Sequence, residues 1–150
     1  MKNFIFIFIA VFSLISCDRT ETDENMVIGE WKLQSATHVY TQTTTDYSAK
    51  NIVYNFQNDG TLIVTGETNS GYNEGYYNYV FKKDYISNEP SMNEPKNYLV
   101  IIENQKWIFN RSNNQLTLDQ TYVDGELLTF TRVEKKTSHN MGSCCTTPFF

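Results

Sequence analysis

Short runs of alternating apolar and polar residues, separated by turn residues, are the feature that most limits the folds open to this chain. The first run covers Ile28–Ser35. Its Trp31, Leu33 and Ser35 would share one face, because successive side chains of a strand point to opposite sides. No stretch of the sequence has a convincing helical period. The pattern therefore predicts an all-β fold.

Eight such runs are spaced along the chain. We predict strands over residues 28–35, 51–57, 61–65, 76–83, 97–103, 106–110, 115–120 and 126–133. Tight turns such as Asn58-Asp59-Gly60 join most of them, since Gly, Asn and Asp tolerate positive φ. Eight short strands joined in this way favour an up-and-down antiparallel barrel, which closes its own edges. A β-sandwich is the alternative.

Two connections are longer than the others, Thr37–Lys50 and Gly66–Gly75. In an up-and-down barrel the connections alternate between the two ends, so these two would flank the same mouth. Long loops in a compact domain often carry function. An apolar ligand entering at this mouth would pass Tyr40, Tyr47 and Tyr72.

The N-terminus has the form of a secretory signal. Lys2 precedes an almost wholly apolar run over residues 4–15, which is too short for the roughly 20 residues that a spanning helix needs. The following Leu14-Ile15-Ser16-Cys17 resembles the lipobox of bacterial lipoproteins. That resemblance implies that residues 1–16 are removed and that Cys17 becomes the lipidated first residue. The alternative is an ordinary cleaved signal with an incidental cysteine.

The segment after the leader would be a tether. Residues 17–26 carry Cys17 followed by a polar, largely acidic stretch with little to bury. In lipoproteins of the Bacteroidota type, such a stretch resembles a signal for export to the cell surface, and a flexible spacer is the alternative. We therefore expect the chain to be held on a membrane of the cell envelope by its lipid, at the outer membrane or on the cell surface.

A single domain would occupy residues 27–133, and residues 134–150 would form a disordered tail that lacks a strand pattern. The tail contains the adjacent Cys144 and Cys145, for which we have no functional account. The chain has 12 basic and 17 acidic residues and a net charge of −5. It therefore lacks the basic patches expected of a nucleic-acid-binding protein.

Three motifs resemble those of lipocalin-like proteins, in particular lipocalin-like bacterial lipoproteins. The first is Gly29-Glu30-Trp31, the second is the hairpin Tyr54-x-Phe56-x-x-Asp59-Gly60-Thr61, and the third is Asn113–Leu118 followed by Phe130 and Arg132. The resemblance implies that Trp31 closes one end of the barrel. It also implies that Arg132 lies across the indole and that Gly29 allows the backbones to approach. Such a cation–π contact contributes roughly 0.5–2 kcal/mol.

The sequence offers little for catalysis or metal binding. The two histidines are His38, in a predicted loop, and His139, in the tail. No carboxylate pair or Ser/His arrangement stands out, and no Cys/His spacing resembles a zinc site. We therefore expect no enzyme activity, no cofactor and no metal.

The leading functional hypothesis is the binding of a small, apolar ligand inside the barrel or at its mouth. Alternating aromatic residues would provide its contacts: Tyr54, Phe56, Tyr77, Tyr79 and Phe81. The alternative is that the same side chains fill the barrel, in which case the protein would be a surface accessory or interaction protein without a ligand. No protein partner can be named from the residues.

Overall fold

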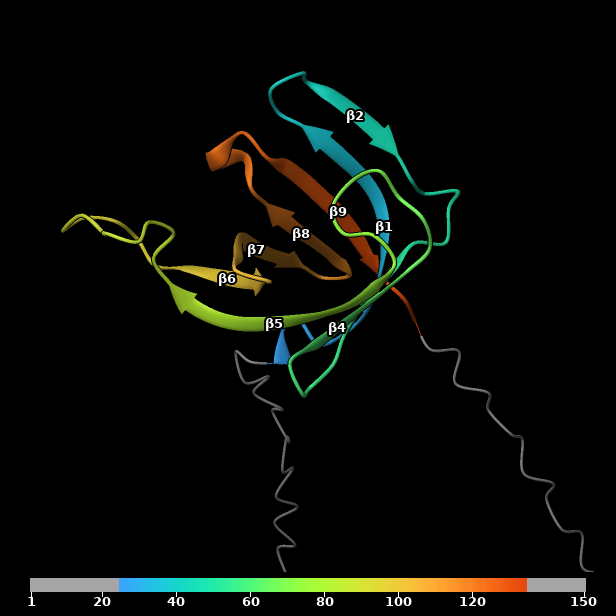
Figure 1. Cartoon of the computed structure of the whole chain (residues 1–150), viewed down its shortest axis with the longest axis horizontal. Helices are drawn as coiled ribbons and strands as arrows, with labels where there is room; N and C mark the ends of the chain where they lie inside the picture. Colours follow the sequence, from blue (N-terminus) through green and yellow to red (C-terminus); the bar gives the residue numbers. More distant parts are fainter. Residues whose placement is uncertain (1–24, 135–150) are drawn as a thin grey trace, which may run out of the picture.

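The computed structural model describes residues 25–134, in which one antiparallel sheet closes into a barrel (Figure 1). Its elements are β1 (Gly29–His38), β2 (Thr43–Asp46), β3 (Val53–Phe56), β4 (Thr61–Thr65), β5 (Gly75–Asp84), β6 (Asn97–Ile102), β7 (Gln105–Ser112), β8 (Gln115–Asp119), the 3-10 helix η2 (Thr121–Val123) and β9 (Glu126–Arg132). From β3 onward each strand pairs with the next, and both β3 and β9 pair with β1. This closed sheet confirms the predicted eight-stranded up-and-down barrel and excludes the sandwich.

The predicted long loop Thr37–Lys50 is wrong. β1 continues to His38, the chain turns, and β2 runs back along the second half of β1 with Asp46 opposite Ser35. All four residues of β2 are exposed. A strand that is solvated on both faces has no apolar–polar alternation, so the sequence pattern could not reveal it. β2 and β3 follow one another along the same side of β1 and act as one interrupted strand.

The predicted inward face of β1 is correct only for its first half. Trp31 and Leu33 are fully buried, but Ser35 is only half-buried and Ala36 takes the next buried position. The pairing between β1 and β9 shifts between Leu33 and Ser35. A bulge of this kind inserts one residue and reverses the alternation beyond it.

β6 was the one predicted strand that is apolar on both faces, and the structure gives a reason. Leu99 faces outward by alternation, yet it is fully buried. On the same outer wall, the Lys106 ammonium donates hydrogen bonds to the carbonyls of Tyr85 and Ile86 and to the Asn88 side chain. The connection after β5 is thereby held against the barrel wall.

The barrel has two ends that differ in construction. The Trp31 end contains the start of β1, the end of β9 and the turns at residues 57–60 and 113–114. The Tyr72 end contains the turn at residues 39–42, the loop 66–74 and the connection that includes η2. The two connections that the sequence placed at one mouth therefore do lie at the same end. We call residues 66–74 the mouth loop.

No helix within residues 25–134 is long and apolar enough to cross a membrane. The leader, Cys17, most of the tether and the tail with His139, Cys144 and Cys145 lie outside the described residues. Their assigned roles and the predicted domain boundaries remain predictions.

Candidate functional site: the two ends of the barrel

Trp31, Arg132 and Gly29 meet at the Trp31 end, as the sequence analysis expects. Trp31 is fully buried, and its Nε1 donates a 2.7 Å hydrogen bond to the Val27 carbonyl. The Arg132 Cζ lies 5.0 Å from the centroid of the indole ring. Gly29 has φ +123°, and a Cβ there would lie 2.9 Å from Arg132 Nη2. A larger residue at position 29 would therefore displace the guanidinium.

Arg111 is a member of this end that the sequence analysis missed. Its Cζ lies 5.7 Å from the Trp31 ring centroid, and its Nη1 donates to the Met26 carbonyl at 3.0 Å. Arg132 Nη2 donates to the Ile28 carbonyl at 3.2 Å. Three consecutive carbonyls, those of residues 26–28, thus accept hydrogen bonds from three side chains on three strands. The arrangement closes the barrel and fixes the chain before β1.

Three of the five predicted ligand contacts lie inside the barrel, where they pack against neighbouring side chains. Tyr54 and Phe130 meet edge to face with ring centroids 4.9 Å apart, and Phe56 and Tyr79 do so at 5.0 Å. Tyr79 also donates a hydrogen bond to the Gln57 carbonyl at 2.6 Å. Side chains of the protein itself therefore take up this part of the interior.

The other two predicted contacts, Tyr77 and Phe81, are half-buried and lie in different surroundings. Phe81 stacks on Tyr98, with centroids 5.8 Å apart, and meets Phe109 at 4.9 Å. Tyr77 packs against Tyr72, with ring centroids 5.0 Å apart. All five predicted residues thus belong to one hydrophobic cluster or pack against it, but they contact different neighbours there.

The Tyr72 end is closed by the side chain of Tyr72 itself. Its hydroxyl lies 3.2 Å from the Ile102 carbonyl and 2.9 Å from Gln105 Oε1, and it accepts a 3.2 Å hydrogen bond from Trp107 Nε1. Its ring lies 6.1 Å from that of Trp107. Burial raises the pKa of Tyr72, as does the charge of Glu103. The phenol is therefore held neutral at the edge of an apolar core.

The backbone of the mouth loop contacts the barrel as closely as the side chain of Tyr72 does. The Tyr72 N–H donates to the Tyr54 hydroxyl at 2.8 Å, and that hydroxyl donates to the Tyr72 carbonyl at 3.3 Å. Burial raises the pKa of Tyr54 far above its ordinary value. Gly71 has φ +67°, and a Cβ there would lie 2.6 Å from the Tyr54 hydroxyl and 2.9 Å from Leu128 Cδ1. Only glycine permits this approach.

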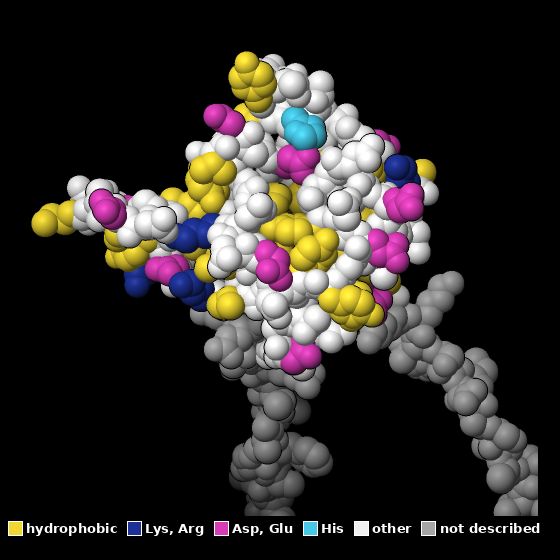
Figure 2. Space-filling view, in the orientation of Figure 1, with side chains coloured by type: hydrophobic (Ala, Val, Ile, Leu, Met, Phe, Trp, Pro, Cys, Tyr) yellow, Lys and Arg dark blue, Asp and Glu magenta, His cyan; other side chains and the backbone are white. Residues whose placement is uncertain are grey.

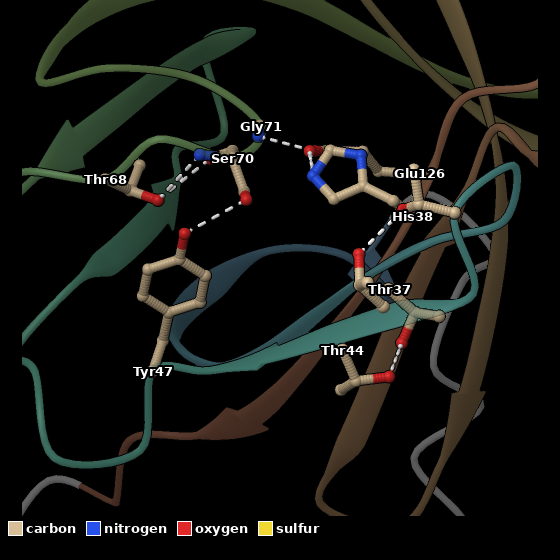
Figure 3. A network of polar contacts seen from close by, with 10 residues as sticks. Thr37, His38, Thr44, Tyr47, Thr68, Ser70, Gly71 and Glu126 are labelled. Atoms are coloured by element: carbon tan, nitrogen blue, oxygen red, sulfur yellow. Dashed lines mark hydrogen bonds and ion pairs between the residues drawn. The ribbon is translucent and has the colours of Figure 1, made fainter.

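Further contacts fasten the mouth loop to β9 and to the segment after β2 (Figure 3). Glu126 Oε2 accepts a 2.7 Å hydrogen bond from the Gly71 N–H, while its Oε1 lies 2.9 Å from His38 Nε2. The hydroxyls of Tyr47 and Ser70 are 3.0 Å apart. His38 thus serves in a structural contact.

The predicted route for a ligand past Tyr40, Tyr47 and Tyr72 is closed in this structure. Tyr47 is buried under the mouth loop, whereas Tyr40 is 86 % exposed at the tip of the turn after β1. A hollow of about 390 Å³ lies on the mouth loop itself, and one of about 610 Å³ lies beside Gly29 and Arg132 at the opposite end. Within residues 25–134, no group of three His, Cys, Asp or Glu side chains could hold a metal ion.

Comparison with known protein families gives a match that covers most of the chain. A family described as "Lipocalin-like domain" matches residues 10–106, which is more than half of the 150 residues. No curated protein and no solved structure gives a significant match.

Proposed function

The chain belongs to the lipocalin-like domain family, and on that premise we propose that it is a lipid-anchored envelope protein whose barrel binds a small, apolar ligand at the Tyr72 end. The family consists mostly of non-enzymatic binding proteins. The role proposed here is accordingly binding without catalysis, with the ligand entering where the mouth loop now lies.

One observation carries the proposed site. Three polar groups converge at the rim of an otherwise apolar interior: the Tyr72 hydroxyl, the indole N–H of Trp107 and the side-chain amide of Gln105. The Tyr54 hydroxyl holds the Tyr72 backbone above the same interior. Ligand sites typically combine an apolar wall with a few convergent polar groups. The closure above them is a loop, which can move without breaking the barrel's strand pairing.

At the Trp31 end, Trp31, Arg111 and Arg132 Nη2 donate to residues 26–28, and Arg132 Nη1 is buried without a hydrogen-bond partner among residues 25–134. That end is closed by strand side chains, so opening it would disturb the barrel itself.

The packed interior favours a second candidate, a filled barrel that acts through its outer surface. Exposed apolar side chains would then form the contact, and Tyr40, Tyr76 and Met92 are 86 %, 78 % and 101 % exposed. These residues lie on separate elements, and the face in Figure 2 shows apolar side chains scattered among polar ones. Scattered apolar residues are normal on a protein surface, so we place this candidate second.

A binding titration separates the two candidates. The protein is prepared as Cys17→Ser, so that no acyl chain competes, and titrated with the neutral apolar fluorophore N-phenyl-1-naphthylamine. We expect saturable binding that weakens about tenfold or more in Tyr77→Lys, because a charged group would face the apolar site. Phe81→Lys is the matched control, since Phe81 lies on the same strand but packs elsewhere. The absence of saturable binding would favour the filled barrel.

The lipid anchor has its own test. Cells that produce the wild-type protein should incorporate a labelled fatty acid into it, and Cys17→Ser should abolish the label and release the protein from membranes. Equal labelling of the two proteins would exclude lipidation at Cys17.

A further inference from the structure

We propose that Tyr72 is an internal stopper, whose phenol occupies the ligand site at the Tyr72 end, and that the ligand which displaces it is a neutral planar aromatic molecule with a hydroxyl group. This inference rests on the function proposed above and names both the ligand class and the closed state of that same site.

The surroundings of the Tyr72 ring are those of a binding pocket. Tyr77 packs edge to face against the ring at 5.0 Å, and the Trp107 indole lies at 6.1 Å. The hydroxyl meets one donor, Trp107 Nε1, and two acceptors, the Ile102 carbonyl and Gln105 Oε1. A flat ring with a hydroxyl at one edge can accept from Trp107 Nε1 and donate to one of the two acceptors, because a hydroxyl both accepts and donates.

The stopper leaves one of these groups imperfectly satisfied. A phenol has a single proton, so the Tyr72 hydroxyl can donate to the Ile102 carbonyl or to Gln105 Oε1, but not fully to both. Tyr72 is also only half-buried, and it belongs to a loop whose ordering costs conformational entropy. A free hydroxyaromatic molecule would make the same hydrogen bonds as the phenol, and its binding would differ by restoring the conformational freedom of the loop.

The charges around the site select against an anionic ligand. Glu126 holds the Gly71 N–H directly beside Tyr72, and the charge of Glu103 acts on the Tyr72 hydroxyl. Glu126 contacts the imidazole of His38, and Glu103 accepts from the Asn78 N–H. Among the hydrogen bonds and ion pairs found within residues 25–134, neither carboxylate contacts a lysine or an arginine. A carboxylate ligand would meet like charges there, whereas a neutral hydroxyl would not.

The test compares two probes of nearly equal shape on the Cys17→Ser protein. 2-Naphthol can donate a hydrogen bond, and 2-methoxynaphthalene cannot. Binding is followed by nuclear magnetic resonance at the indole N–H signals of Trp107 and Trp31, which lie at opposite ends of the barrel. The signal that Trp107→Phe removes identifies Trp107.

We expect 2-naphthol to shift the Trp107 signal saturably and to bind roughly tenfold more tightly than 2-methoxynaphthalene, the usual value of one hydrogen bond. Tyr72→Ala should tighten binding of 2-naphthol about tenfold, because no closed state competes. Tyr72→Phe keeps the ring but lacks the hydroxyl, and should tighten it less. Tyr76→Ala, which removes a tyrosine that is 78 % exposed, should change nothing.

Two results would overturn the stopper. One is an affinity for 2-naphthol that is the same in wild type, Tyr72→Ala and Tyr72→Phe. The other is a shift confined to the Trp31 signal. If N-phenyl-1-naphthylamine still binds saturably in either case, the small-ligand function stands without the stopper. If no probe binds to any variant, both proposals fail.

Discussion

The two ends of the barrel are both closed, but by different kinds of structure. At the Trp31 end, the closing side chains come from the strands themselves, so the register of the sheet fixes their positions. At the Tyr72 end, the closing residue belongs to a loop that touches the barrel through its own side chain and a few hydrogen bonds. Loops open at lower free energy than the strands that they connect. The comparison indicates a structural role for the first end and fits the ligand exchange proposed for the second.

The strongest test of this difference removes the indole at the Trp31 end. Trp31→Ala should lower the free energy of unfolding by roughly 3–5 kcal/mol, because a fully buried aromatic side chain leaves a cavity. Urea unfolding measures the change. Tyr40→Ala, at the exposed tip of the other end, should change the free energy by less than about 0.5 kcal/mol. Similar losses in both variants would contradict a structural role peculiar to the Trp31 end.

At the Tyr72 end the corresponding test adds one methyl group. Gly71→Ala should cost about 1–3 kcal/mol, because the new Cβ would clash with the Tyr54 hydroxyl and the backbone has positive φ. Gly75→Ala is the matched control at the end of the same loop, since its Cβ would have no neighbour closer than 3.5 Å. The same unfolding measurement applies. If the two substitutions cost the same, the mouth loop does not dock on Tyr54.

A double-mutant cycle examines the cation–π contacts at the Trp31 end. Trp31→Ala and Arg132→Ala should couple by roughly 0.5–2 kcal/mol, because the guanidinium lies against the indole. The cycle with Arg111→Ala should also give a coupling energy, since Arg111 lies over the same ring. Lys83→Ala is the control, because Lys83 lies over Tyr98 instead. Strictly additive costs for Arg132 would mean that the two side chains do not interact.

The smallest expected effect concerns pH. Burial raises the pKa of Tyr79 from 10.0 to about 12, with a smaller contribution from the charge of Asp59. Between these values the unfolded chain loses a proton that the folded chain keeps, so the free energy of unfolding falls as pH rises. Tyr79→Phe removes this ionisable group. The free energy of unfolding should therefore fall less steeply with pH than it does in wild type, by the contribution of one proton. A slope identical to that of wild type, measured by urea unfolding from pH 9 to 11.5, would contradict the burial of this hydroxyl.

The sequence predicted the barrel because its strands alternate and its turns are marked by glycine and asparagine. The strand at residues 61–65 has the predicted bounds, and the closing pair Trp31 and Arg132 follows from a short motif and its resemblance. β2 was not predicted because its residues are polar on both faces. The bulge that places Ala36 inside depends on pairing with β9, which lies far along the chain.

The candidate site was harder to predict because its members are distant in sequence and come from different elements. The sequence placed Tyr72 at the predicted mouth, but its partner Trp107 is 35 residues away on β7. Arg111 reaches Met26 across 85 residues. Neither partner carries a local signal, because a buried indole or a half-buried arginine is equally expected in an ordinary core or wall. Only the closure of the sheet brings them together.

The attachment of residues 26–28 also has a mechanical consequence. A force applied through the N-terminal side of the chain would first load the hydrogen bonds from Arg111, Trp31 and Arg132 to these carbonyls. The three side chains stand on β7, β1 and β9, so the load would be divided among three strands at once. A single strand pulled from its end would instead lose its hydrogen bonds one after another. A barrel tethered at its N-terminus would thus resist being peeled open from the side at which it is held.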